Sequence, residues 1–234
     1  MVNLYYFTSA VHAISNIEND RIKISRFSDL NDPFELLGVN RGDLHTRKKL
    51  QRQKKEINKK EGLICLSKSW RNPLICGHYA DRHKGIVLGF EVKDRLWDIK
   101  YESKLIDAPI DLTYNFAKKK FIKKLMTTKF KDWEYENEVR VFQKLSGTEC
   151  IKEGENYFRN FNEDFILKEV IFGSMCSLSD MKETLKLIKK PRFSSVEITK
   201  ARIAFQDYKV VVNKIKTKEI NLLREQLLKE STAV

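Results

Sequence analysis

Long apolar runs are missing from this chain, because no stretch approaches the ~20 residues that a membrane-spanning helix requires. The first seven residues contain no basic region and no small-residue cleavage site, so they do not indicate a signal peptide. Cysteine is scarce: the 4 cysteines are scattered, form no Cys-x-x-Cys pair and have no histidine ladder beside them. This pattern argues against structural zinc and indicates reduced thiols in a cytoplasmic protein.

Glycine and proline are also few, with 9 and 4 residues, and no Pro/Gly/Ser-rich linker or internal repeat interrupts the chain. A hydrophobic content of 41% is typical of a folded globule rather than a disordered chain. We therefore expect a single α+β domain over residues 1–234, with its core at about 4–212. A basic helical insertion is expected at about 43–61, and a C-terminal helix at 213–230.

Several common catalytic motifs are absent from the sequence. It contains no Gly-x-Gly-x-x-Gly and no Gly-Lys-Thr/Ser phosphate loop, so the standard nucleotide-binding folds have no support. It contains no nucleophile elbow. The nearest histidine pair, His78 and His83, lies five residues apart, a spacing that falls between helical faces, so no metal site is expected.

Hydrophobic periodicity nevertheless predicts regular structure along most of the chain. Apolar or alternating runs predict strands at 4–7, 21–25, 63–67, 85–92, 99–101, 168–173, 195–201 and 210–212. Helical spacing and capping residues predict helices at 8–17, 43–61, 72–81, 112–130, 179–190 and 213–230.

Basic residues far outnumber acidic ones, which gives a formal net charge of +13. Such a chain attracts polyanions such as nucleic acid. The excess is concentrated in the expected helix at 43–61, whose candidate phosphate-contacting residues are Arg47, Lys48, Lys49, Arg52, Lys54 and Lys55. The alternative is that this run is only a solvated helix face.

The most distinctive segment, Trp133 to Phe142, alternates carboxylates with aromatic and β-branched residues. This spacing predicts a strand with Glu134, Glu136 and Glu138 on one face. Three neighbouring carboxylates repel one another, and a fold does not require such a row. The row is either a site for a hydroxyl group or a developing cation, or an exposed face balanced by Arg140 and the many lysines.

Three further segments carry candidate polar groups. Ser67 and Ser69 end a buried strand and point the same way, although they could simply cap the turn that follows. His78 and Tyr79 lie on the expected helix and could face a cleft or be buried. The segment 31–35, Asn-Asp-Pro-Phe-Glu, would form an Asx turn with or without a function.

Taken in order, these segments resemble a large bacterial and phage family that is defined only as a domain of unknown function. The matching segments are Leu4 to Phe7, Asn31 to Glu35, Leu66 to Gly85, and Trp133 to Arg140. Cys76 departs from the family pattern, which more often has tryptophan there, and this weakens the expectation of an aromatic wall.

The layout of that family is similar to the ADP-ribosyltransferase superfamily, which implies a split mixed sheet with flanking helices. The corresponding segments here are Tyr6-Phe7-Thr8-Ser9, Ser67-Lys68-Ser69 and Glu136-Asn137-Glu138. The first position is tyrosine, whereas the well-described classes have histidine or arginine.

The resemblance implies NAD as the substrate and assigns roles to these residues. Glu138 would hydrogen-bond the ribose 2′-OH and stabilise an oxocarbenium-like state, while Glu136 would activate or orient the acceptor. The NAD-binding residues would be Tyr6, Thr8, Ser67, Ser69, His78, Tyr79 and Arg140.

Three functional hypotheses follow. The first is an enzyme that transfers or hydrolyses the ADP-ribose of NAD, in phage–host conflict or a toxin system, with nucleic acid or protein as the acceptor. The second is a non-enzymatic nucleic-acid-binding or sensor protein that uses the basic helix. The third is a metal-dependent nuclease that uses Asp32, Glu35 and Glu138.

Overall fold

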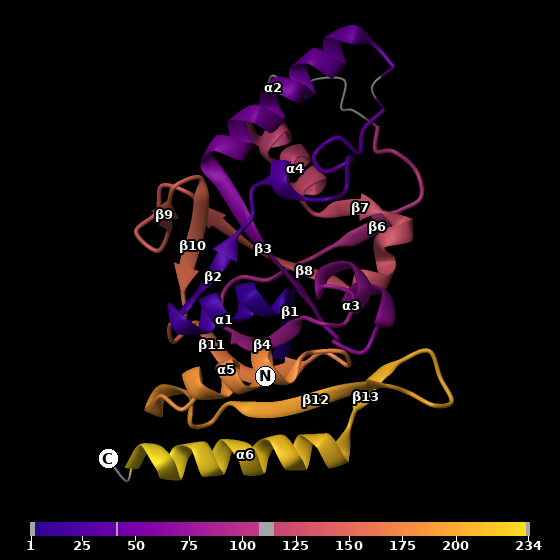
Figure 1. Ribbon diagram of the computed structural model, residues 1–234. Coiled ribbons are helices and arrows are strands. Elements are labelled where there is room, and N and C mark those ends of the chain that lie inside the picture. Colours follow the sequence, from indigo (N-terminus) through magenta and orange to yellow (C-terminus); the bar gives the residue numbers. More distant parts are fainter. Residues whose placement is uncertain (1–2, 41, 108–114, 233–234) are drawn as a thin grey trace. The chain divides into compact units, whose positions relative to one another are not determined.

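The structure is a computed structural model, and the residues that it describes are 3–40, 42–107 and 115–232 (Figure 1). The chain divides into two compact units. The first unit comprises residues 1–22, 66–94 and 160–234, and the second comprises residues 23–65 and 95–159. No helix within the described ranges is long and apolar enough to cross a membrane.

The first unit is built on a large mixed sheet. Its strands are β1 (Asn3–Thr8), β4 (Ile86–Val92), β11 (Phe165–Phe172), β12 (Glu197–Ile203) and β13 (Val210–Val212). They neighbour one another in the order β13-β12-β11-β4-β1, with β11 parallel to β12 and the other pairs antiparallel. β1 also pairs with the end of β3 (Glu61–Ser67), where Tyr5 stands opposite Ser67.

Helices pack against this sheet, and polar caps fix where they begin. They are α1 (Ala10–Glu18), α3 (Pro73–Tyr79), α5 (Leu178–Leu187), the short η3 (Pro191–Phe193) and α6 (Lys214–Thr232). Ser9, Asn72 and Ser177 cap α1, α3 and α5 by accepting backbone hydrogen bonds. In Figure 1, α6 runs alongside β12, and the Lys200 amide donates to Thr217 Oγ1 at 2.9 Å.

The second unit contains shorter strands and two basic helices, α2 (Leu44–Lys60) and α4 (Asn115–Met126). It also contains two short helices, η1 (Phe27–Asp29) and η2 (Lys131–Glu136). The strands, besides most of β3, are β5 (Trp97–Asp98), β6 (Lys100–Glu102), β7 (Thr128–Phe130), β8 (Glu138–Lys144) and β9 (Ile151–Glu153). β8 lies between β3 and β5, and β6 pairs in parallel with β7. β2 (Arg21–Ile24) and β10 (Asn156–Asn160) cross between the units along the chain.

An apolar cluster forms the core of the second unit. Its buried members are Phe27, Leu36, Val39, Leu50, Leu63, Ile106, Phe121 and Leu125. α2 contributes only Leu50 to these buried members, whereas α4 contributes Phe121 and Leu125. Both basic helices are therefore anchored on the same core by a narrow apolar stripe, and their remaining faces are polar.

These elements confirm the expected mixture of helices and a large mixed sheet. The expected strands at 4–7, 63–67, 85–92 and 168–173 correspond to β1, β3, β4 and β11, and the expected helix at 43–61 corresponds to α2. The expected helix at 112–130 is observed as α4 and ends earlier, while its first residues, 112–114, lie outside the described residues.

The strand expected over Trp133 to Phe142 is wrong in its first half. Residues 131–136 form the short helix η2, and β8 begins only at Glu138. Asn137 between them adopts a left-handed conformation with φ 46° and ψ 50°, which asparagine tolerates better than most residues. The three glutamates therefore do not share a strand face: Glu134 is exposed, whereas Glu136 and Glu138 are buried.

Candidate functional site

A cluster of buried charges lies in the second unit. Its five members come from the Asn31–Glu35 segment, β7, η2 and β8: Glu35, Lys129, Glu136, Glu138 and Arg140. None is more than 6% exposed. Charged groups are rarely buried unless they are paired, so their placement has to be explained by their partners.

Arg140 is the centre of this buried charge cluster. Strand alternation puts Glu138 and Arg140 on the same face of β8, and Arg140 Nε donates to Glu138 Oε1 at 2.7 Å. Its Nη1 donates to Glu35 Oε2 at 3.0 Å and to the Met126 carbonyl at 2.8 Å. Nη2 donates to Glu35 Oε1 and, at 3.2 Å, to Glu138 Oε2. The guanidinium therefore forms a two-pronged contact with each carboxylate.

The Asn31–Glu35 segment delivers Glu35 to Arg140. Asp32 Oδ1 accepts from the Phe34 amide at 2.9 Å, which forms the expected Asx turn. Lys54 Nζ donates to the Glu35 carbonyl at 2.8 Å and thereby ties α2 to the turn. Lys54 is thus engaged inside the unit, in contrast to its expected place on a phosphate-contacting surface.

Lys129 completes the cluster from β7. Its Nζ donates to Glu136 Oε2 at 2.5 Å and to Glu138 Oε2 at 3.4 Å, and lies 4.8 Å from the Trp133 ring centroid. The Tyr101 hydroxyl accepts from the Glu138 amide at 2.8 Å. η2 and β8 therefore bring both expected catalytic carboxylates, Glu136 and Glu138, to one ammonium group.

The electrostatics of the cluster favour the charged forms of Glu138 and Lys129, whereas burial raises the pKa of the Glu35 carboxyl above its usual 4.5 despite the neighbouring Arg140 guanidinium. Burial works against ionisation of Glu138, but Arg140 and Lys129 outweigh it and hold the pKa of this carboxyl at about 2, below its usual 4.5. Burial likewise disfavours the Lys129 ammonium, yet Glu138 and Glu136 raise the pKa of this lysine above 10.5. Glu138 is thus ionised at neutral pH and is paired with Arg140 and Lys129, cations that it shares with Glu35 and Glu136.

A cavity of about 270 Å³ lies in the same unit and includes Lys129 in its wall. Asp32, Phe34 and residues from β6 and β7 supply other parts of the wall. Lys129 thus belongs both to the buried charge cluster and to the wall of this cavity.

The remaining expected NAD-binding residues lie in the first unit. Tyr6 and Thr8 are on β1, Ser67 ends β3, and His78 and Tyr79 end α3. Ser67 Oγ donates to the Ser69 carbonyl at 3.0 Å and accepts from the Ser69 amide at 3.3 Å. Ser67 is therefore bonded locally to Ser69, and α3 is capped by Asn72, whereas the capping alternative had expected the serines to do so.

The expected site residues therefore belong to two separate groups. Glu136, Glu138 and Arg140 meet in the second unit. The other expected residues belong to the first unit: Tyr6, Thr8, Ser67, Ser69, His78 and Tyr79. From the sequence, Glu35 was expected in an Asx-turn segment and as a candidate nuclease residue, and Lys129 was not singled out. The position of Lys129, next to the Trp133 segment in sequence, was the one signal that could have suggested a partner for the glutamates.

Within the described residues, no group of three or more histidine, cysteine, aspartate or glutamate side chains is placed to hold a metal ion. Both Glu35 oxygens accept from Arg140, so the nuclease hypothesis gains no support from the geometry.

No family model, curated protein or solved structure matches the chain. Membership of the family of unknown function therefore stays a prediction.

Proposed function

We propose that the protein binds nucleic acid through a basic stripe on α2. The stripe is defined as Lys48, Arg52, Lys55 and Lys59, and all of these side chains are exposed. Their spacing of four, three and four residues keeps them on one face of the helix. At a rise of 1.5 Å per residue the stripe is about 16 Å long, so it can meet several successive phosphates. This alignment of exposed cations is the observation that carries the proposal.

The opposite face of α2 holds the stripe in place. Leu50 is buried in the core of the unit and Ile57 packs against that core. Asn58 accepts from the Ser28 amide at 2.9 Å and donates to Ser28 Oγ at 3.1 Å. A helix fixed in this way loses little conformational freedom when its exposed side binds a partner.

Little negative charge offsets the stripe. The only acidic residue within α2 is Glu56, which pairs with Lys59 at 3.2 Å, and both side chains are well exposed. Such a surface pair is weak and exchanges readily with a phosphate. α4 is anchored on the same core, and the part of it whose side chains are described adds four exposed lysines: Lys119, Lys120, Lys123 and Lys124.

Arg47, which was also expected to contact phosphate, is exposed at the margin of the stripe, and Lys49 is half-buried. Lys59 belongs to the same basic run but was not among the six candidate phosphate-contacting residues. Its position four residues after Lys55 is the helical signal that completes the stripe.

The proposal is tested by fluorescence anisotropy with labelled duplex DNA, single-stranded DNA and RNA. The α2 variant combines Lys48→Gln, Arg52→Gln, Lys55→Gln and Lys59→Gln, because glutamine keeps helix propensity while removing charge. We expect the wild-type protein to bind at least one of these nucleic acids, and the α2 variant to bind it at least about tenfold more weakly.

A matched control removes the same amount of charge from exposed lysines of the first unit. It combines Lys84→Gln, Lys93→Gln, Lys182→Gln and Lys186→Gln. The control variant should bind like the wild type. Equal weakening of both variants would mean that net charge, rather than the stripe, governs binding.

A second candidate is ADP-ribose chemistry on NAD, favoured by the convergence of Glu136 and Glu138 on Lys129 beside a cavity. It ranks second because both oxygens of Glu138 accept from protein cations, so a ribose hydroxyl would have to displace one of them. A carboxylate that is already paired with protein cations also stabilises a developing positive charge less than an unpaired carboxylate does.

Nicotinamide release from NAD tests this second candidate, with or without nucleic acid as the acceptor. Glu136→Gln and Glu138→Gln should abolish release while thermal melting shows that each variant is folded. Absence of release from the wild-type protein under every condition would leave nucleic-acid binding as the sole proposal.

A further inference from the structure

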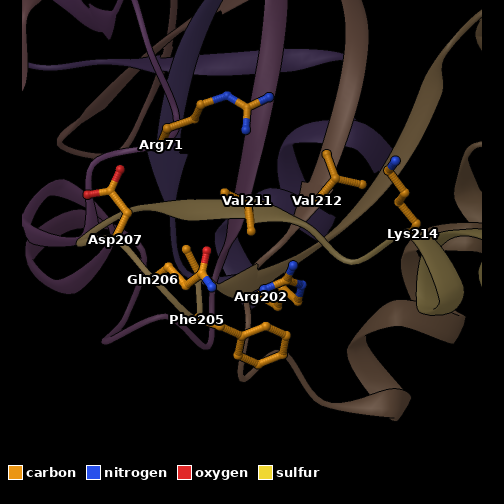
Figure 2. A pocket seen from close by; sticks show the side chains of 9 residues that line it. Arg71, Arg202, Phe205, Gln206, Asp207, Val211, Val212 and Lys214 are labelled. Carbon is orange, nitrogen blue, oxygen red and sulfur yellow. The ribbon is translucent and has the colours of Figure 1, made fainter.

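A cavity of about 610 Å³ lies in the first unit, where the β12–β13 turn meets the segment that follows β3. Figure 2 shows its labelled side chains around Val211, with Arg71, Arg202 and Lys214 approaching from three different parts of the chain. The lining residues are Arg71, Arg202, Ala204, Phe205, Gln206, Asp207, Val211, Val212 and Lys214. Cavities of this size accommodate small ligands of nucleotide dimensions.

The wall of this cavity is positively charged. It contains three cationic side chains and one carboxylate, Asp207. That carboxylate already pairs with Lys209 at 2.6 Å, and the hydrogen bond from Lys209 lowers the pKa of Asp207 below 3.8. α6 begins at Lys214, so the positive end of its helix dipole adds to the same region. The net field favours an anion.

An exposed aromatic ring borders the cations. Phe205 is 88% exposed, and the Arg202 guanidinium lies 4.3 Å from its ring centroid. An apolar ring left in solvent at the edge of a cavity is available for stacking, and a cation behind it strengthens contact with a planar base. Tyr208, on the same turn, is 95% exposed but does not line the cavity.

Backbone hydrogen bonds hold the cavity wall in shape. The Val210 amide donates to the Arg71 carbonyl at 2.8 Å, and the Ala204 amide donates to the Lys209 carbonyl at 2.9 Å. Arg202 pairs with Val211 across the β12–β13 ladder. The Arg71 amide also donates to Ser69 Oγ at 3.2 Å. The cations therefore project from a fixed framework, which lowers the cost of ordering them around a ligand.

We propose that this cavity binds a nucleoside phosphate. The base stacks on Phe205, and the phosphate oxygens accept hydrogen bonds from Arg202, Arg71 and Lys214. The same chemistry is offered by a free nucleotide and by one nucleotide of a single strand. The proposal concerns the first unit and does not depend on the α2 stripe of the second.

Isothermal titration calorimetry with the full chain tests the proposal, using ATP, AMP, adenosine and pyrophosphate as probes. A decathymidine strand is titrated into the α2 variant, so that the stripe does not contribute. Its binding shows whether the cavity takes a nucleotide of a single strand as well as a free nucleotide. We expect ATP or the strand to bind with a Kd below about 1 mM, and adenosine to bind at least about tenfold more weakly because it lacks phosphate.

Two substitutions identify the groups that act. Arg202→Gln should weaken ATP and pyrophosphate alike, whereas Phe205→Ala should weaken ATP by about tenfold and leave pyrophosphate unchanged. The matched controls, Tyr208→Ala and Lys218→Gln, should bind like the wild type. Phe205, Tyr208 and Lys218 are exposed and Arg202 is half-buried, so thermal melting is measured for each variant to check that it is folded.

No binding of ATP or the strand at millimolar concentration would overturn the proposal. So would binding that Arg202→Gln and Phe205→Ala change no more than the controls do. If only the α2 variant loses nucleic-acid binding, the α2 proposal is supported, and the nucleotide titrations still decide the cavity proposal.

Discussion

Replacing Arg140 with methionine tests the buried charge cluster most severely. The guanidinium is fully buried at 0% exposure and donates to Glu35, to Glu138 and to the Met126 carbonyl. Methionine fills similar space but leaves two buried carboxylates without their main cation. Breaking one side of a buried ion pair costs about 3–5 kcal/mol, which is a large part of the 5–15 kcal/mol that stabilises a typical domain.

Urea unfolding, followed by tryptophan fluorescence and far-ultraviolet circular dichroism, measures this loss. Trp97 and Trp133 belong to the same unit as Arg140 and report its unfolding. Lys216→Met is the matched control, because Lys216 pairs with Glu219 at 2.7 Å on the surface, with both side chains more than half exposed. This exposed pair should contribute no more than about 1 kcal/mol.

A second substitution separates loss of the ion pair from loss of packing. Glu35→Gln combined with Arg140→Met removes one of the stranded carboxylates, so the double variant should regain part of the lost stability. The cluster does not behave as a buried network if Arg140→Met lowers the free energy of unfolding no more than Lys216→Met does. The same conclusion follows if Glu35→Gln lowers it as much in the Arg140→Met background as in the wild type.

Three further outcomes are expected. The pKa of Glu138 is lowered from 4.5 to about 2, so its ionised form stabilises the fold above pH 4.5, and this contribution of about 3 kcal/mol is lost as the pH falls towards 2. Urea midpoints measured against pH should therefore fall more steeply for the wild type than for Glu138→Gln. Asn137 has a φ of 46°, so Asn137→Gly should keep or slightly raise the melting temperature, whereas Asn137→Val should lower the free energy of unfolding by about 1–3 kcal/mol. Equal melting temperatures for the two variants would contradict the left-handed conformation of Asn137. Gly85→Ala should cost about 1–3 kcal/mol in urea unfolding, since an added Cβ would lie 2.1 Å from the Thr8 carbonyl oxygen, while Gly38→Ala, with nothing within 4 Å, should be nearly neutral.

Much of the fold is predictable from the sequence where one local signal dominates. β4 and β11 are apolar runs, and α2 combines an Asp43 cap with Leu50 and Ile57 on one face. In these segments burial and local propensity favour the same structure, so no information from distant residues is needed.

The segment before β8 shows why local patterns can mislead. Alternation over Trp133 to Phe142 fits a strand, yet Asn137 turns the chain through a left-handed conformation and the residues before it coil into η2. The Asn137 amide then donates to the Glu134 carbonyl at 3.1 Å. A single residue with tolerance for positive φ was enough to override the two-residue period.

The buried charge cluster could not be predicted from local sequence patterns, because its partners are distant in sequence. Glu35 and Arg140 are 105 residues apart in sequence, and their contact depends on how β8 and the Asn31–Glu35 turn are placed in the second unit. The sequence suggested Arg140 only as a balance for an exposed glutamate face, whereas the fold buries Glu138 against Arg140 and Lys129 and brings Glu35 to the same guanidinium.

The salt dependence of nucleic-acid binding tests the central claim most directly. Each phosphate contact contributes about 0.9 to the slope of log K against log salt concentration for a duplex. Between about 50 and 300 mM KCl, the α2 variant should therefore show a slope shallower than the wild type by about 2–4, while the Lys84, Lys93, Lys182 and Lys186 control keeps the wild-type slope. A wild-type protein that does not bind, or an α2 variant with an unchanged slope, would contradict the claim.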